Sequence, residues 1–367
     1  PENKRVIFDF DSIYAFATGK PSEAFGDRYL PFDEDRIIAR LPGPPYQFLD
    51  RIISIKDCQQ WQLVAGGVIE AEYDVPADAW YFDENRQAIM PFAVLLEIAL
   101  QPCGWLAAYL GSALTSDADL SFRNLGGKAS QYLNVTPDTG VLHTTIKITN
   151  VSQSGGMIIQ HYDYLVRCSK DVVYKGNTYF GFFTAEALAT QIGIREVQPY
   201  QATENERARN KAFSYPDHSP FPKDMMRMVD QIEIFDPEGG PNGLGFIQGL
   251  ANVDPDAWFF KAHFYQDPVW PGSLGLESFI QLLKLMAYHL WGQDRNDNEL
   301  SFESMGLNEE HNWIYRGQIL PKDNQVTVSA VINEIRHGEK LIKAEGFLSV
   351  DGRIIYQMND FTLRMGG

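Results

Sequence analysis

The sequence has few cysteines and a deficit of positive charge, and each shortage excludes a class of protein. Its three cysteines, Cys58, Cys103 and Cys168, are far apart and odd in number. We therefore expect neither a disulfide scaffold nor a CxxC metal site. Lys and Arg number 31 against 48 Asp and Glu, which gives a net charge of −17. This charge argues against nucleic acid and anionic membranes as partners, although it allows a local basic patch.

Long uninterrupted apolar runs are also missing, as are two common catalytic and nucleotide-binding motifs. Residues 91–111 form the longest apolar-rich stretch outside the C-terminal half, but they include Glu97, Gln101 and Pro102. A buried helix fits this stretch better than a membrane span. The N-terminus has no long apolar segment, so we expect no signal peptide and a cytoplasmic protein. Neither GxSxG nor GxxxxGK[ST] occurs.

The chain contains two copies of one pattern. Residues 78–82 (DAWYF) correspond to residues 256–260 (DAWFF) at an offset of 178. Beyond the next loop the offset becomes 180, and it then relates Pro91 to Pro271, Glu97 to Glu277, Gln101 to Gln281, and residues 120–122 (LSF) to residues 300–302 (LSF). This ordered series predicts a duplication in which the second copy carries two extra residues in that loop.

Each copy shows the same coarse order of secondary structure. Alternating polar and apolar residues predict antiparallel strands over residues 143–152, 157–168, 172–184, 325–335, 340–350 and 353–365. A long apolar helix within such a sheet indicates the α+β class. We predict an N-terminal extension over residues 1–40, a first unit over 41–190, a polar connector with a short helix over 191–217, and a second unit over 218–367.

Residues 258–281 (WFFKAHFYQDPVWPGSLGLESFIQ) carry the most distinctive chemistry. His263 stands in an aromatic run, and Gly272 follows a proline at the start of an expected helix. The free N–H groups of such a helix start can bind an anion or polarise a carbonyl. Glu277 and Gln281 are four residues apart and share one helix face, where an apolar setting makes them costly unless they are used or satisfied.

This stretch resembles the active-site signature of the FabA-type 3-hydroxyacyl-carrier-protein dehydratases. The tandem arrangement and residues 5–19 (RVIFDFDSIYAFATG) also resemble the dehydratase regions of bacterial polyunsaturated fatty acid synthases, which are very large multienzymes. The resemblance implies a double hot-dog fold, in which each of two tandem units wraps an antiparallel sheet around a long central helix. It also implies that the catalytic His and acid come from opposite units.

Carried onto this sequence, the resemblance makes His263 the base that removes the α-proton. The backbone N–H of Gly272 would polarise the thioester carbonyl. The first copy has Asn85 in place of the His and Phe92 in place of the Gly, but its helix keeps an acid. The partner of His263 would then be Glu97, oriented by Gln101. Asn85, Glu277 and Gln281 would form a vestigial second site. The FabA type usually has Asp at the acid position and the related FabZ type has Glu, which leaves the isomerase activity and the acyl-chain length open.

The implied reaction needs no redox cofactor and no metal, and its substrate would arrive on the phosphopantetheine of an acyl carrier protein. Asp267 lies four residues after His263, but the prolines that follow it indicate a loop rather than a metal-binding helix. Neighbouring synthase domains would be the other partners, with no nucleic acid and no membrane span. Two alternatives are a hot-dog thioesterase and a non-catalytic acyl-binding module.

Overall fold

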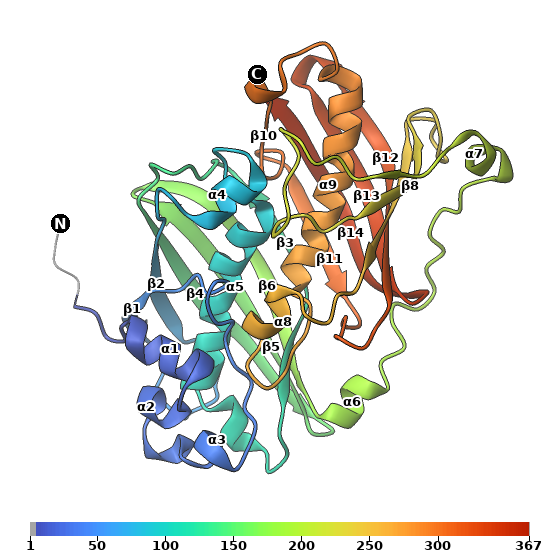
Figure 1. Cartoon of the computed structure of the whole chain (residues 1–367). Coiled ribbons are helices and arrows are strands. Elements are labelled where there is room, and N and C mark those ends of the chain that lie inside the picture. Colours follow the sequence, from blue (N-terminus) through green and yellow to red (C-terminus); the bar gives the residue numbers. More distant parts are fainter. Residues whose placement is uncertain (1–4, 367) are drawn as a thin grey trace.

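The computed structural model describes residues 5–366, and residues 1–4 of the predicted extension lie outside this range. The chain forms one 14-stranded sheet with the order β1-β2-β4-β5-β6-β3-β11-β14-β13-β12-β9-β8-β7, and β10 pairs with β14 beside this path. Figure 1 shows that the sheet curves around two long helices, one in each half. The predicted α+β class and double hot-dog architecture are confirmed.

The first half contributes six strands, whose bounds are β1 (Arg51–Lys56), β2 (Val68–Asp74), β3 (Ser121–Gln131), β4 (Val141–Ser154), β5 (Met157–Cys168) and β6 (Asp171–Phe183). The second half contributes β7 (Phe213–Ser214), β8 (Gln231–Asp236), β9 (Phe246–Asn252), β10 (Ser301–Phe302), β11 (Glu310–Tyr315), β12 (Gln325–Arg336), β13 (Leu341–Val350) and β14 (Arg353–Gly366). All six predicted strands are present. Their alternating burial, as in β5, reflects one face turned to the core and one toward solvent.

The two halves are joined edge to edge through β3 and β11. These strands pair antiparallel, with Lys128 opposite Asn312 and Gly126 opposite Ile314. Because backbone hydrogen bonds run through this junction, the halves share one sheet and their two central helices lie on the same side of it. The first helix, α5 (Phe92–Tyr109), contacts the second, α9 (Gly272–Trp291).

The helix α5 is long and apolar enough to cross a membrane by length and composition, but 89% of that stretch is buried inside the protein. Its buried residues lie all around its circumference, as expected for a helix enclosed by a sheet and by other helices. The prediction that this segment is a buried core helix is therefore confirmed.

A small helical cluster precedes the first hot dog and packs on α5. It consists of α1 (Phe10–Thr18), α2 (Pro21–Phe25) and α3 (Pro31–Glu34). The ring of Phe25 lies 5.8 Å from that of Trp105, and Tyr29 donates a hydrogen bond to the carbonyl of Ala108. The sequence predicted an extension here but not this packing. The cluster therefore packs on the C-terminal half of α5.

Four further α-helices lie within residues 5–366, namely α4 (Trp80–Asn85), α6 (Ala185–Ala189), α7 (Glu204–Arg209) and α8 (Trp258–Ala262). The helix α7 lies in the predicted connector and begins with a capping box between Thr203 and Glu206. The connector also supplies β7, which pairs with β8 and so belongs to the second half of the sheet.

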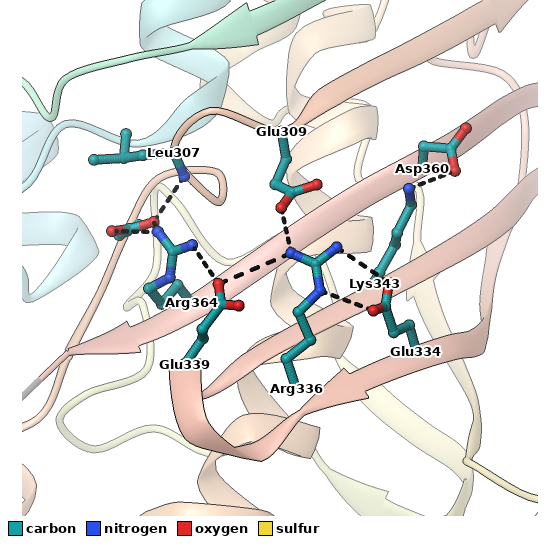
Figure 2. Close-up of polar contacts among 9 residues, drawn as sticks. Leu307, Glu309, Glu334, Arg336, Glu339, Lys343, Asp360 and Arg364 are labelled. Atoms are coloured by element: carbon teal, nitrogen blue, oxygen red, sulfur yellow. Dashed lines mark hydrogen bonds and ion pairs between the residues drawn. The ribbon is translucent and has the colours of Figure 1, made fainter.

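An ion-pair network fixes the loop between β10 and β11 to the strands β12 to β14 (Figure 2). Arg336 reaches Glu309 at 2.5 Å and Glu334 at 2.8 Å, while Arg364 reaches Glu303 at 3.0 Å. The side chain of Glu339 links the two arginines, at 3.8 Å from Arg336 and 3.3 Å from Arg364. The network holds the chain just before β11, the strand that joins the two hot dogs.

Candidate active site

The carboxylate of each central helix reaches the first turn of the other central helix. Ser273 at the start of α9 donates a 2.6 Å hydrogen bond to Oε1 of Glu97 on α5. In the reverse direction, the backbone N–H of Ala93 at the start of α5 donates a 3.0 Å bond to Oε2 of Glu277 on α9. Each half therefore places the carboxylate of its central helix against the other half, across the interface between α5 and α9.

One cavity collects the predicted catalytic groups. Its walls come from both halves, and they include Glu97, Gln101, Arg123, His263, Gly272, Ser273, Tyr315 and Gln318. The acid in the cavity with His263 is thus the one from the first half, while Glu277 is not among the residues that line it. The cavity therefore brings His263 together with Glu97 of the opposite half, and the catalytic roles of both stay predictions.

Glu97 is buried and held by two donors. Besides the bond from Ser273, Nε2 of Gln101 donates to Oε2 of Glu97 at 3.0 Å. Gln101 is itself fixed, because its Oε1 accepts from the backbone N–H of Phe48 at 2.7 Å and its Nε2 donates to the carbonyl of Tyr46 at 2.8 Å. Burial raises the pKa of Glu97, and the bonds from Ser273 and Gln101 only partly oppose this. A raised pKa favours a carboxyl that can donate a proton.

His263 follows the last residue of α8, and its ring is also buried. Its Nδ1 lies 2.9 Å from the carbonyl oxygen of Val269, which can only accept a hydrogen bond. Nδ1 therefore carries the proton in the neutral ring, and Nε2 keeps a lone pair. Burial lowers the pKa of His263 to about 3, and the nearby Arg123 guanidinium contributes in the same direction. The ring is neutral at pH 7 and is suited to act as a base.

The loop that carries His263 is tied to the first half by an ion pair. Arg123 of β3 donates two bonds to the carboxylate of Asp267, at 2.7 and 2.8 Å, and a third from Nε to Gln318 at 2.8 Å. Asp267 is thus engaged by an arginine. Within residues 5–366 no group of three or more His, Cys, Asp or Glu side chains is placed to hold a metal ion.

Gly272 is the first residue of α9, so its N–H has no acceptor within the helix. A Cβ at this position would lie 2.9 Å from Cζ of Tyr315, which explains why only glycine fits. The hydroxyl of Tyr315 is buried and has no hydrogen-bond partner in the part of the chain that the structure describes. A free N–H and a free O–H therefore meet at the start of α9, where both can donate to a substrate oxygen.

The equivalent place in the other half is closed. Lys284 donates a 2.9 Å bond from Nζ to Oδ1 of Asn85 and lies 3.9 Å from Oε1 of Glu277. Gln281 is bound to the backbone of Met226 and Met228 in the way that Gln101 is bound in the first half. Asn85 and Glu277 of the predicted vestigial site therefore meet at Lys284, while Gln281 lies one turn after Glu277 on α9 and is held by the backbone.

The FabA-like domain family matches this chain twice, over residues 41–177 and 221–359. The chain belongs to the FabA-like family. The two matched ranges correspond to the two predicted copies of the pattern, so the expected resemblance is confirmed.

Individual relatives extend this finding. The chain is 30% identical to a polyunsaturated fatty acid synthase polypeptide of Thraustochytrium sp., over 95% of this chain and 25% of that protein. The chain thus spans about a quarter of that relative's length. Among solved structures, it is similar to the dehydratase domain from the CurJ module of curacin polyketide synthase, at 14% identity and a TM-score of 0.43 over 86% of this chain and 96% of that one. It is also similar to the 12:0-ACP thioesterase from Umbellularia californica, at 8% identity and a TM-score of 0.41 over 82% and 94%.

The FabA-like signature identified the groups on the second central helix and its loop, but Arg123 and Tyr315 of the site and Lys284 of the closed half escaped sequence reasoning. Arg123 and Tyr315 lie on strands far from the signature, and nothing in their local sequence marks them. Lys284 did leave a signal, because a lysine on the apolar face of a core helix requires a buried partner.

Proposed function

We propose that this chain is a 3-hydroxyacyl-carrier-protein dehydratase, which converts 3-hydroxyacyl thioesters into trans-2-enoyl thioesters and water. The observation that carries this proposal is the crossed cavity, where a neutral His263 and a buried Glu97 from opposite halves meet beside the start of α9. A base and an acid whose raised pKa favours its protonated form, together in one cavity, are the two groups that an elimination of water requires.

In the proposed reaction, Nε2 of His263 removes a proton from the α-carbon of the thioester. The negative charge that develops on the thioester oxygen is stabilised by the N–H of Gly272 and the positive end of the α9 dipole. Glu97 gives its proton to the departing β-hydroxyl, which leaves as water because hydroxide is a poor leaving group. The step ends with a protonated His263 and an ionised Glu97, and transfer of one proton back to the carboxylate resets the site.

Because the reaction only moves protons and water, it consumes no redox cofactor and requires no metal. We propose that an acyl carrier protein delivers the substrate on phosphopantetheine, and that the chain works in the cytoplasm beside other domains of a polyunsaturated fatty acid synthase. The 30% identity to a polypeptide of such a synthase supports this setting. Tethering to those domains would raise the local concentration of an acidic carrier against a chain of net charge −17.

The test is an absorbance assay for enoyl thioester formation from 3-hydroxyacyl-pantetheine, with a second readout for free thiol. His263→Ala and Glu97→Gln should each lower kcat by about 10²–10⁴-fold. Glu277→Gln is the matched control on the other helix, and it should keep activity per folded molecule even though it leaves Lys284 less well paired.

Three outcomes would overturn the proposal. Free thiol without enoyl product would indicate a thioesterase. A folded wild type that binds acyl-pantetheine without converting it would indicate a non-catalytic acyl-binding module. Loss of activity in Glu277→Gln but not in Glu97→Gln would show that the crossed pairing is wrong.

A further inference from the structure

The carboxylates of the two central helices have different hydrogen-bond donors. Glu277 accepts a 3.0 Å bond from the backbone N–H of Ala93, so it caps the first turn of α5, where free N–H groups are concentrated. In the part of the chain that the structure describes, Glu97 accepts bonds from the side chains of Ser273 and Gln101 and from no backbone N–H. The acid of the catalytic cavity therefore leaves the start of α9 uncapped.

A pair of buried hydroxyl groups accounts for this difference. Oη of Tyr46 lies 2.9 Å from Oγ of Ser273, and Ser273 donates to Oε1 of Glu97 at 2.6 Å. An ionised Glu97 can only accept, so the single proton of Ser273 points to the carboxylate and the Ser273 oxygen accepts the proton of Tyr46. The chain of donors runs from Tyr46 through Ser273 to Glu97, and all three side chains are buried.

The surroundings of Glu277 have neither hydroxyl. At the offset of 180, Met226 is the counterpart of Tyr46. The structure supports this match, because the carbonyls of Tyr46 and Met226 each accept a bond from the glutamine of the central helix in the same half, at 2.8 and 2.6 Å. Ala93 is the counterpart of Ser273 at the same offset. With a thioether and a methyl group in place of the two hydroxyls, Glu277 takes the backbone N–H of Ala93 instead.

We propose that Tyr46 and Ser273 are positioning residues that hold Glu97 away from the first turn of α9, and so keep the N–H groups there free for the thioester oxygen of the substrate. The proposal rests on the proposed dehydratase function and adds two residues to its site. A carboxylate bound to the start of α9 would place negative charge beside Gly272, where the proposed reaction develops an oxyanion. Tyr46 is not among the residues that line the cavity, so its hydroxyl acts through Ser273.

The experiment measures the binding of two unreactive analogues of butyryl-pantetheine by calorimetry. In both analogues a methylene replaces the sulfur; one keeps the carbonyl, and the other has a further methylene in its place. The wild type should bind the carbonyl analogue about threefold to tenfold more tightly, as one net hydrogen bond predicts. In Tyr46→Met/Ser273→Ala, which reproduces the surroundings of Glu277, the two affinities should agree within about twofold.

Three further variants separate positioning from structural damage. Adding Glu97→Ala to the double variant should restore the preference for the carbonyl analogue, because no carboxylate then competes for the start of α9. Met226→Leu, at the position matched to Tyr46, should leave the preference unaltered. Tyr46→Phe removes one oxygen only and should lose part of the preference, which keeps the proposal testable if the double variant does not fold.

A wild type without preference, a preference that survives in the folded double variant, or a loss that Glu97→Ala does not restore would each overturn the proposal. The dehydration assay on the same proteins separates this proposal from the proposed function. A wild type that forms no enoyl product while the affinities change as expected would refute the dehydratase and leave the positioning of Glu97 supported. An active wild type whose affinities do not respond would refute the positioning alone.

Discussion

Removing the charge of Arg123 should loosen the loop that carries His263 and shift the pKa of His263. Arg123 ties the first hot dog to the loop that carries His263 through its two bonds to Asp267. Arg123→Met keeps much of the apolar stem and deletes the guanidinium. Lys128→Met is the matched control. Lys128 lies on the same strand β3, but its side chain is 55% exposed and its ion pair with Glu310 is long, at 3.6 Å.

The size of the effect follows from burial. The side chains of Arg123 and Asp267 are 11% and 22% exposed, so the pair is partly screened by solvent. Breaking a fully buried pair costs about 3–5 kcal/mol, and exposed pairs contribute about 0–1 kcal/mol. We therefore expect Arg123→Met to lower the free energy of unfolding by about 1–3 kcal/mol. A base displaced by about 1 Å can cost about 10²-fold in rate, so kcat should fall by about 10–10²-fold.

The pH dependence has a definite sign. Burial raises the pKa of Asp267, but the Arg123 guanidinium outweighs this and holds that pKa below its usual value. Burial lowers the pKa of His263, and Arg123 lowers it further while Asp267 opposes. Without Arg123 the pKa of His263 therefore rises. His263 must be neutral to act as a base, so the acidic limb of the kcat/KM profile should move to higher pH.

The measurements are denaturant unfolding and a pH profile of the dehydration rate. They are made on Arg123→Met, on Asp267→Asn and on the double variant Arg123→Met/Asp267→Asn. The double variant carries no uncompensated charge and should recover part of the lost stability. If the two single losses simply add in the double variant, or if the acidic limb stays in place, the ion pair does not position the loop and the reasoning is refuted. Lys128→Met should change neither quantity appreciably.

Two further predictions concern the acid and the ion-pair network. Ser273→Ala removes a hydrogen bond that lowers the pKa of Glu97, so burial raises that pKa further and the basic limb of the rate profile should move to higher pH; a limb that moves to lower pH would contradict the assignment of Glu97 as the acid. Arg336→Met removes the centre of the network in Figure 2, so Tm should fall at low ionic strength and much less at high salt; a loss of Tm that salt does not change would show that packing rather than charge is responsible.

The features that the sequence predicts best are those that occur in both copies of the repeat. Strand alternation and the repeated landmarks predict the strands of the sheet and the two central helices. The crossed acid follows from the absence of a His at position 85, together with the expectation that paired hot dogs share a site. The division into an extension, two units and a connector stays a prediction, as do the catalytic roles.

The parts that escaped prediction depend on contacts between distant segments. Arg123 and Asp267 are 144 residues apart, and no local pattern connects them. The cluster α1 to α3 has no second copy to compare, so its packing on Trp105 left no repeated signal. The sequence predicts a polar connector with a short helix but not β7, which joins the sheet because an edge strand needs a backbone partner more than a distinctive side-chain pattern.

The lysine in the closed half shows what covalent fusion of two hot dogs permits. In a homodimer both halves carry the same residue at every position, so a lysine at the position of Lys284 would obstruct both sites at once. In a single chain with two unlike halves, the lysine is present at position 284 alone. Its counterpart in the first half, at the offset of 180, is Gly104. One half can then hold a buried polar contact where the other keeps a cavity, so the two halves can diverge in sequence while one site stays open.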